Sequence, residues 1–380
     1  MVADSYDDTS ESSAGGPSFH PTCNYNIKMA LHTIPTELRL TIAELLDART
    51  CFKLALTSRE DYHLYSSLLA KHKERFARYK TLDTSREDAG RLVWDVTKEI
   101  IERPELAQYV EDVSLPDTRQ SVWVADTHLP RPMDNLPLQV PEDVVKLYAK
   151  AARSIPIMKA AMETTSYDTN YHGFNWNMEQ TMRLGSDEPV AALLVVLATH
   201  LYTLRFTEFE GHSNYFLHVI KEVARASLDP IKAVSVPLQH LTYVAISYWD
   251  TELCCQAVWA DVFISLPSLR GLAARKMGGL LDEWLDDDER VNMRKSKVKD
   301  ILFQTCYFHP RTLEHILSGT ESLRSFTYDD GGPDVSDEGC FASRRVTAAL
   351  LKHAAHSLEH LTLHDVDGYD VSHILCLIES

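Results

Sequence analysis

The sequence predicts an α/β chain in which a short helical N-terminal unit precedes an irregular array of alternating strands and helices. Three observations lead to this prediction. A short apolar pattern recurs along most of the chain, helix-period segments lie between its copies, and three amphipathic segments come before them. The 380 residues are 44% hydrophobic and 24% charged, which is ordinary for a soluble globular protein. This length suits two or three domains, or one extended repeat array.

We expect four parts along the chain. Residues 1–30 are rich in Ser, Asp and Gly and are expected to form a disordered tail. Residues 31–70 hold the three amphipathic segments, and residues 71–104 form a helical linker. The repeat array is expected to occupy residues 105–380.

The first helix is expected to begin at Ile34 and Pro35, because Pro is favoured in the first turn of a helix. Leu38, Ile42 and Leu45 follow at positions i, i+4 and i+7 of this segment. This spacing places the three side chains on one face of the helix.

Further helices are expected after this one. Leu54 and Leu56 lie in a second segment, and Tyr62 follows in a third. A long polar helix is expected from Asp61 to about Tyr79, and an amphipathic helix from Trp94 to Ile101.

A six-residue pattern with apolar first, fourth and sixth positions (L-x-x-L-x-L) recurs at spacings of mostly 25 to 37 residues. Helix-period segments such as NYFLHVIKEVARAS, RTLEHILSG and RRVTAALLKHAAHS lie between its copies. A short strand that alternates with a helix at this period is typical of a leucine-rich-repeat-like solenoid. The copies are Val110/Val113/Leu115, Leu201/Leu204/Phe206, Leu238/Leu241/Tyr243, Leu269/Leu272/Ala274, Val298/Ile301/Phe303, Leu323/Phe326/Tyr328 and Leu358/Leu361/Leu363.

The array is irregular. The gap between Leu115 and Leu201 is too long for one repeat and holds a Pro-rich loop and two or three helices. The Asn or Cys that regular repeats carry three residues after the pattern occurs only as Cys306. The most apolar stretch, Val190 to Phe206, is too short to span a membrane and is expected to form a buried helix that runs into a buried strand. The alternative is a mixed α/β domain in which the apolar triplets are coincidental.

The N-terminal unit is too small to bury all of its own apolar side chains. Units of about 40 residues rarely supply an adequate core. Covering six such side chains would be worth roughly 9–18 kcal/mol, at about 1.5–3 kcal/mol each. That gain is comparable with the cost of association, which is estimated at about 4–15 kcal/mol. We therefore expect either a second protein or the repeat array to cover this surface.

Residues 31–70 resemble an F-box. The resemblance lies in an apolar-Pro-x-Glu-Leu start, then Ile and Leu at helical spacing, and then LALTSR followed by an aromatic residue. Downstream, RPELAQYVEDVSL and LLKHAAHSLEHLTL are similar to segments of fungal F-box proteins with leucine-rich-repeat-like C-terminal domains. The resemblance implies a three-helix F-box that docks on a Skp-type adaptor, and through it on a cullin, in an SCF-type cullin–RING ubiquitin ligase. The repeat domain would then recruit a protein client.

The resemblance also implies which side chains contact the adaptor or form the F-box core. In this sequence, Glu60 and Asp61 stand where members of the family often carry basic or apolar residues. The alternative is a helical cap on the repeat array, with all of these apolar residues in its own core. The positions that match the family's adaptor-facing and core positions are Ile34, Pro35, Leu38, Ile42, Leu45, Leu54, Leu56 and Tyr62.

On each strand, the residue between the second and third apolar positions is expected to point away from the core. A row of small polar groups with one Arg is more typical of a protein-contact surface than of a catalytic pocket. We expect the client to bind there, and the net charge of −17 favours a basic client. The outward residues are Ser114, Arg205, Thr242, Ala273, Leu302, Thr327 and Thr362, of which Arg205, Thr242, Thr327 and Thr362 are the candidate client-binding residues.

We expect no catalytic activity, cofactor or metal. The sequence contains no G-x-G-x-x-G, G-x-x-x-x-G-K or G-x-S-x-G motif, so neither a nucleotide-binding fold nor a hydrolase is indicated. The four histidines between His353 and His364 and the acidic segment 283–290 lack the composition and spacing of metal sites. Segment 168–178 is dense in Asn and aromatic residues and is either a recognition surface or a loop folded on the array.

The remaining features indicate an intracellular protein, in the cytoplasm and/or the nucleus. The chain has seven cysteines but no C-x-x-C pair, and it has no N-x-S/T acceptor. Cys254 and Cys255 are expected to be buried, inert thiols in a helix. The negative net charge disfavours nucleic acid, and no membrane contact is expected. The alternative to a ligase subunit is a leucine-rich-repeat scaffold that binds proteins without ligase assembly.

Overall fold

The chain divides between Ala70 and Lys71 into two compact units, and each is described by itself. The first unit is helical, and the second combines parallel strands with helices. The predicted tail, the acidic segment 283–290 and nearly all of segment 168–178 lie outside the described residues. The computed structural model describes residues 33–85, 92–116, 140–165, 178–209, 215–248, 254–279, 296–331 and 343–364.

Side chains cap two of the short helices of the first unit. Asp47 accepts hydrogen bonds from the backbone N–H groups of Arg49 and Thr50 at the start of α3, and Ser58 accepts one from Asp61 at the start of α4. The predicted continuous helix from Asp61 to Tyr79 is wrong, because the chain breaks between α4 and α5. The helices are α2 (Thr36–Leu45), α3 (Ala48–Ala55), α4 (Arg59–Leu64) and α5 (Ser66–Tyr79), the last of which continues into the second unit.

A small core holds the first unit together. Ala43, Cys51, Ala55 and Tyr65 are each at most 1% exposed. The break between α4 and α5 at Tyr65 accompanies the burial of its ring in this core, whereas Tyr62 remains exposed. A core of this size contributes no more than about 3–5 kcal/mol. The leucines that pack around it are Leu40, Leu46, Leu54, Leu64, Leu68 and Leu69.

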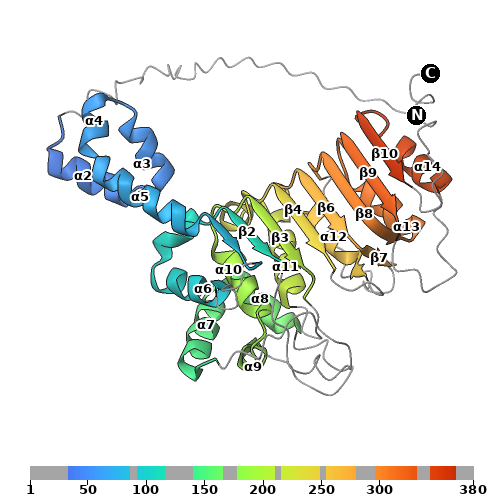
Figure 1. The fold of residues 1–380 in the computed structure, drawn as a ribbon, viewed down its shortest axis with the longest axis horizontal. Helices are drawn as coiled ribbons and strands as arrows, with labels where there is room; N and C mark the ends of the chain where they lie inside the picture. Colours follow the sequence, from blue (N-terminus) through green and yellow to red (C-terminus); the bar gives the residue numbers. More distant parts are fainter. Residues whose placement is uncertain are drawn as a thin grey trace, which may run out of the picture. The chain divides into compact units, whose positions relative to one another are not determined.

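The second unit is built on a sheet in which every described strand pair is parallel. Eight strands lie side by side in the order of the chain, and two short strands, β5 (Cys255–Gln256) and β7 (Met277–Gly279), extend from the end of β8 (Figure 1). The predicted α/β class with parallel strands is confirmed. The eight strands are β1 (Thr81–Asp83), β2 (Asp112–Leu115), β3 (Thr203–Thr207), β4 (Tyr243–Ser247), β6 (Gly271–Arg275), β8 (Asp300–Phe308), β9 (Ser325–Asp330) and β10 (His360–His364).

Helices connect the strands and lie along one face of the sheet (Figure 1). The buried helix and strand predicted for Val190 to Phe206 are α10 and β3. The helices predicted for Trp94 to Ile101 and for the three segments between the apolar triplets are also present, as α6, α11, α13 and α14. The helices are α6 (Leu92–Glu102), η2 (Pro104–Tyr109), α7 (Glu142–Ser154), α8 (Pro156–Thr165), α9 (Met178–Arg183), α10 (Glu188–Leu197), α11 (Tyr215–Leu228), η5 (Ala233–Ser235), α12 (Val258–Ile264), α13 (Pro310–Ser318) and α14 (Ser343–His353).

The core of the second unit lies between the sheet and these helices. The ring of Phe206 lies 5.1, 5.2 and 5.9 Å, between ring centroids, from those of Phe216, Trp259 and Phe263. Tilted and edge-to-face aromatic contacts of this kind add stability beyond the burial of apolar area. The residues that stand in register along the middle of the sheet, all almost completely buried, are Val113, Leu204, Val244, Leu272, Ile301 and Phe326.

The third copy of the apolar pattern begins three residues later than predicted. Its frame is Leu241/Val244/Ile246, because Val244 pairs with Leu204 of β3. Leu238 instead lies in the preceding turn, with a φ of 64°. The predicted frame and the observed frame both satisfy the apolar pattern. The end of the preceding turn decides which of them forms the strand.

The described cysteines of the second unit, Cys254, Cys255 and Cys306, are thiols with raised pKa values. Cys254 and Cys255 are not helical as predicted, since Cys255 lies in β5 and α12 begins only at Val258. Burial raises the pKa of both thiols, which keeps them protonated at neutral pH. Burial also raises the pKa of Cys306 to about 12, and its thiol donates to the carbonyl of Gln304 at 3.3 Å.

Candidate protein-binding surfaces

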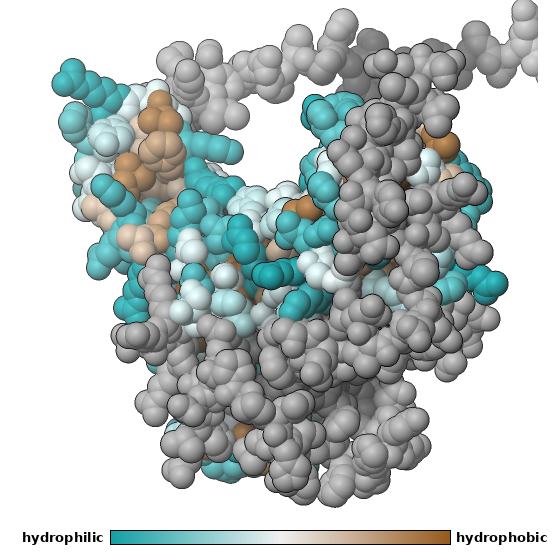
Figure 2. Space-filling model, turned by 45° about the vertical axis from the view of Figure 1, so that its right-hand side comes forward, coloured by the Kyte–Doolittle hydropathy of each residue, from teal (hydrophilic) through white to brown (hydrophobic). Residues whose placement is uncertain are grey.

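The first unit carries most of the exposed large apolar side chains. Nine such side chains are exposed among the described residues, and six of these lie in α2–α4 or at their ends. Figure 2 shows brown, hydrophobic side chains gathered on this unit, at the upper left. The exposed fractions of the six range from 37% for Ile42 to 82% for Leu45. We call these six residues the N-terminal apolar face: Leu38, Ile42, Leu45, Phe52, Leu56 and Tyr62.

Helical periodicity explains why these side chains remain exposed. On α2, Leu38, Ile42 and Leu45 lie on one side, whereas Ala43 on the other side is fully buried. On α3, Cys51 and Ala55 fill the core while Phe52 points outward. The small core is thus occupied by other residues. An exposed apolar group of this kind is typical of a contact site for another molecule.

Five of the eight predicted adaptor-contacting or core residues belong to the N-terminal apolar face. Pro35 is exposed beside them at the N-cap of α2, and Ile34 is half-buried. Leu54 instead packs against the core of the unit. The sequence prediction missed Phe52. Its i, i+4 spacing from Leu56 is the signal that could have identified it.

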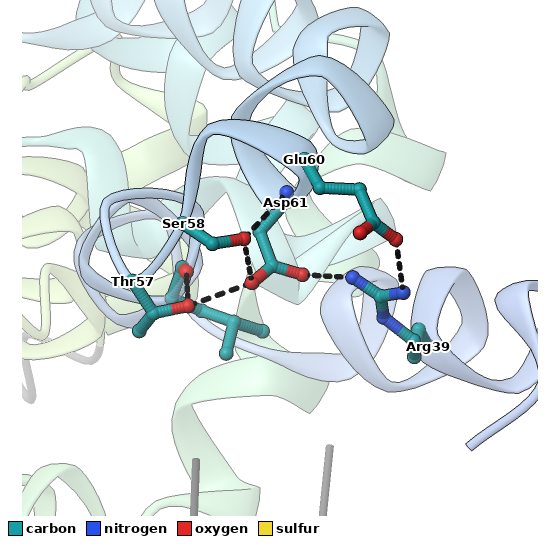
Figure 3. A network of polar contacts seen from close by, with 6 residues as sticks. Arg39, Thr57, Ser58, Glu60 and Asp61 are labelled. Carbon is teal, nitrogen blue, oxygen red and sulfur yellow. Dashed lines mark hydrogen bonds and ion pairs between the residues drawn. The ribbon is translucent and has the colours of Figure 1, made fainter. Parts of the chain in front are cut away.

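Arg39 of α2 binds both carboxylates at the start of α4 (Figure 3). Its Nη1 lies 3.0 Å from Oε1 of Glu60, and its Nη2 pairs with Oδ1 of Asp61. The side chains of Arg39 and Asp61 are 4% and 3% exposed. The hydroxyls of Thr57 and Ser58 donate to the second carboxylate oxygen of Asp61, at 2.8 and 2.7 Å. This network joins α2 to α4.

The two acidic departures from the F-box pattern therefore have an internal partner. Burial by itself would raise the pKa of Asp61, but the hydrogen bonds from Ser58 and Thr57 and the charge of Arg39 hold it below its ordinary value. Asp61 is charged, buried and bound within the unit, so it is not part of the exposed surface. Glu60 is mostly exposed, and its charge is balanced by the same Arg39.

The exposed face of the sheet carries rows of side chains in register. Arg205, Thr327 and Thr362 stand in one row, but Thr242 does not. Thr242 precedes β4, and its hydroxyl donates to the carbonyl of Tyr202 at 3.2 Å. Its predicted place is taken by Ala245, because the frame of this repeat begins later than the apolar pattern indicated. From β1 to β10 the row is Asp83, Ser114, Arg205, Ala245, Ala273, Leu302, Thr327 and Thr362.

Tyr243 forms a flat aromatic surface within this face. Its ring lies against Gly271 of β6, since a Cβ atom at position 271 would be only 2.9 Å from Cδ2 of the ring. The guanidinium carbon of Arg205 lies 5.8 Å from the ring centroid, within cation–π range. At the edge beside it, the rings of His200 and His240 stack at 5.2 Å. Each histidine stands three residues before its strand. This shared position in two successive repeats could have identified the pair from the sequence.

The described side chains do not form a metal site. No group of three or more His, Cys, Asp or Glu residues in the described ranges could hold a metal ion. Two of the histidines between His353 and His364 have protein partners. Nε2 of His353 lies 3.7 Å from Oε1 of Glu314, and Nε2 of His356 lies 3.1 Å from the carbonyl oxygen of Glu321. No helix in the described part of the chain is both long and apolar enough to cross a membrane.

Comparison with known proteins identifies the second unit. None of the curated proteins matches the chain. Residues 84–367, which are 284 of the 380 residues, match the family model described as a leucine-rich repeat domain. This range contains β2 to β10 and their connecting helices. Such domains present an extended strand surface to other proteins. The chain therefore belongs to the leucine-rich repeat domain family.

Proposed function

We propose that this protein is the substrate-recognition subunit of an SCF-type cullin–RING ubiquitin ligase, in the cytoplasm and/or the nucleus. Its first unit would act as an F-box that docks on a Skp-type adaptor and through it on a cullin. Its repeats, arranged as a solenoid, would recruit a protein client. The protein would then act by proximity, since tethering raises the effective concentration of a client lysine near the charged conjugating enzyme.

The observation that carries this proposal is the N-terminal apolar face. If the unit were only a helical cap with its apolar residues in its own core, Leu38, Leu45 and Leu56 would be buried, and each is more than half exposed. Burying an exposed Leu is worth about 1.5–3 kcal/mol, so covering these three would contribute roughly 5–9 kcal/mol. This gain is of the size that association with a second protein requires.

The resemblance to an F-box supports the choice of partner. Leu38, Ile42 and Leu45 match adaptor-facing or core positions of that family, and they lie together on the exposed side of α2. Asp61 is buried in its ion pair with Arg39, so its negative charge does not lie on the surface that would meet the adaptor. A leucine-rich-repeat scaffold without ligase assembly is the competing function.

Affinity capture of the tagged full-length chain from a cell extract tests the proposal. The wild-type chain should retain the adaptor and the cullin. The Leu38→Ser/Leu45→Ser variant should lose roughly 100-fold in adaptor affinity, at about 1.5 kcal/mol for each side chain. A matched control, Ile231→Ser/Val234→Ser, removes two exposed apolar side chains from the second unit and should retain both partners.

Two results would contradict the proposal. One is equal adaptor capture by the wild-type chain and the Leu38→Ser/Leu45→Ser variant. The other is capture of proteins by the wild-type chain without adaptor or cullin, which would favour the scaffold.

A further inference from the structure

We infer that the repeats bind an acidic, extended segment of their client across β3, β4 and β6, through a surface formed by Arg205, Tyr243 and Arg275. This inference rests on the proposed recruitment of a protein client and names the chemistry of the segment that is recruited. It reverses the expectation from net charge, because this part of the sheet is cationic although the chain carries a net charge of −17.

Both arginines lie on the exposed face of the sheet. Burial alternates along each strand, so that Leu204 and Phe206 are buried around the exposed Arg205. On β6, Ala274 is buried and Arg275 is exposed. The helices cover the other face of the sheet, so both guanidinium groups point away from the core.

The register fixes the separation of the two arginines. Arg205 pairs with Ala245, which pairs with Ala273, and Arg275 follows two residues later on the same strand as Ala273. With strands about 4.8 Å apart and about 3.3 Å per residue, the two Cα atoms are roughly 12 Å apart. Arg275 is therefore diagonal to Arg205 across β4.

The sheet surface around the two arginines is low, and an aromatic ring lies beside Arg205. Ala245 and Ala273 occupy the row position on β4 and β6, and neither extends beyond a methyl group. The ring of Tyr243 lies against Gly271, with Arg205 over its face. An extended chain can therefore approach the sheet closely at this place, with an apolar side chain over β4 and the ring of Tyr243 beside its first acidic residue.

The charges favour a carboxylate ligand. Strands β3, β4 and β6 contain no Asp or Glu. The carboxylates of the exposed face stand on other strands. Asp112 of β2 and Asp300 of β8 lie in the row of Tyr243, on strands next to those of the arginines, and Asp83 of β1 lies in the row of Arg205, two strands away. Within the described residues, neither Arg205 nor Arg275 forms an ion pair. Guanidinium groups that have no carboxylate partner among the described residues are suited to bidentate contact with incoming carboxylates.

The separation also indicates the spacing of the ligand. In an extended peptide, residues i and i+4 point to the same side and lie about 13 Å apart. This matches the roughly 12 Å between the two arginines. Residue i+2 would lie between them, over β4 between Ala245 and Ser247. The expected client segment thus has acidic residues at i and i+4 and a small or apolar residue at i+2.

Fluorescence polarisation with two labelled nine-residue peptides tests the inference at low salt, where surface charges are least screened. One peptide has Glu at its third and seventh positions, Leu at its fifth and Ser elsewhere. The other has Lys in place of both Glu residues. The full-length chain should bind the Glu peptide roughly tenfold more tightly than the Lys peptide.

Charge reversal provides the sharper comparison. In Arg205→Glu/Arg275→Glu the preference should switch to the Lys peptide, and in Arg205→Gln/Arg275→Gln it should disappear. The control Lys71→Glu/Lys73→Glu makes the same change in net charge on exposed positions of α5 and should keep the wild-type preference. Circular dichroism of each variant checks that it is folded.

Equal binding of the two peptides by the wild-type chain would overturn the inference. So would a preference that changes as much in the Lys71→Glu/Lys73→Glu control as in the Arg205→Glu/Arg275→Glu variant, because net charge alone would then explain it. These outcomes are separate from those of adaptor capture, which depends on the N-terminal apolar face and should be unchanged in Arg205→Glu/Arg275→Glu. Failed capture with the peptide preference intact would remove the ligase role alone.

Discussion

The Asp61→Ala variant is expected to unfold the N-terminal helical unit. The substitution leaves the guanidinium of Arg39 buried without its closest counter-charge. Removing one partner of a buried ion pair costs about 3–5 kcal/mol, which is as much as the small core of this unit contributes. Amide hydrogen exchange of the full-length chain measures the effect. Protection in α2–α4 should be lost, while protection in α11 of the second unit should not change.

Two further variants distinguish the loss of the buried ion pair from the loss of any charge near Arg39. Glu60→Gln removes the exposed partner of Arg39 and should cost less than about 1 kcal/mol, as is usual for surface ion pairs. Arg39→Met/Asp61→Leu removes both buried charges and should restore much of the protection that Asp61→Ala loses. Unchanged protection of α2 in Asp61→Ala would show that the network does not hold the unit together.

The stability of the first unit should also depend on pH through Asp61. Burial opposes the charged form, but hydrogen bonds from Ser58 and Thr57 and the charge of Arg39 lower the pKa of this carboxyl in the folded state. A lowered folded-state pKa contributes stability that is complete above the unfolded value of about 3.9 and is lost as the pH falls through the folded value. Protection of α2–α4 should therefore fall in acid below about pH 4. In Asp61→Asn, this part of the pH dependence should be absent.

The Gly278→Ala variant should destabilise the second unit. A Cβ atom at this position would lie 2.4 Å from the carbonyl oxygen of Tyr307 and 3.2 Å from Sγ of Cys254. The carbonyl belongs to the backbone of β8, which pairs with Gly278, so it cannot move away without disturbing this pairing. Overpacking of this kind costs about 1–3 kcal/mol, or a fall in Tm of roughly 2–5 °C for a unit of this size, at about 2.1 cal/mol/K of unfolding entropy per residue.

Thermal unfolding followed by circular dichroism measures this change. Thr327→Ala on the exposed face of β9 is a suitable control, because it alters a surface side chain of the same sheet without adding volume. A Tm for Gly278→Ala that equals the wild-type value would mean that the close approach of β7 and β8 is not required.

Much of the repeat fold follows from apolar periodicity. Six of the seven predicted triplets place their second apolar residue in the register of the sheet, because burial of one face selects the residues that alternate along each strand. The exception is the triplet that begins at Leu238. There Leu238, Leu241 and Val244 all stand at spacings of three, and only the turn with a positive φ at Leu238 selects the correct frame.

The candidate surfaces were only partly predictable for related reasons. Helical spacing identifies Leu38, Ile42 and Leu45 as one face, but it does not distinguish an outward face from an inward one. That choice depends on the tertiary pairing of Arg39 with Asp61, two residues far apart in the sequence. The surface around Tyr243 and Gly271 likewise depends on which residues of neighbouring strands stand beside each other.

Calorimetric titration of the purified full-length chain with a purified Skp-type adaptor tests the central claim most directly. We predict saturable one-to-one binding that the Leu38→Ser/Leu45→Ser variant weakens roughly 100-fold and that the Ile231→Ser/Val234→Ser control leaves unchanged. No heat of binding with the wild-type chain, or equal affinity for the wild-type chain and the Leu38→Ser/Leu45→Ser variant, would contradict it.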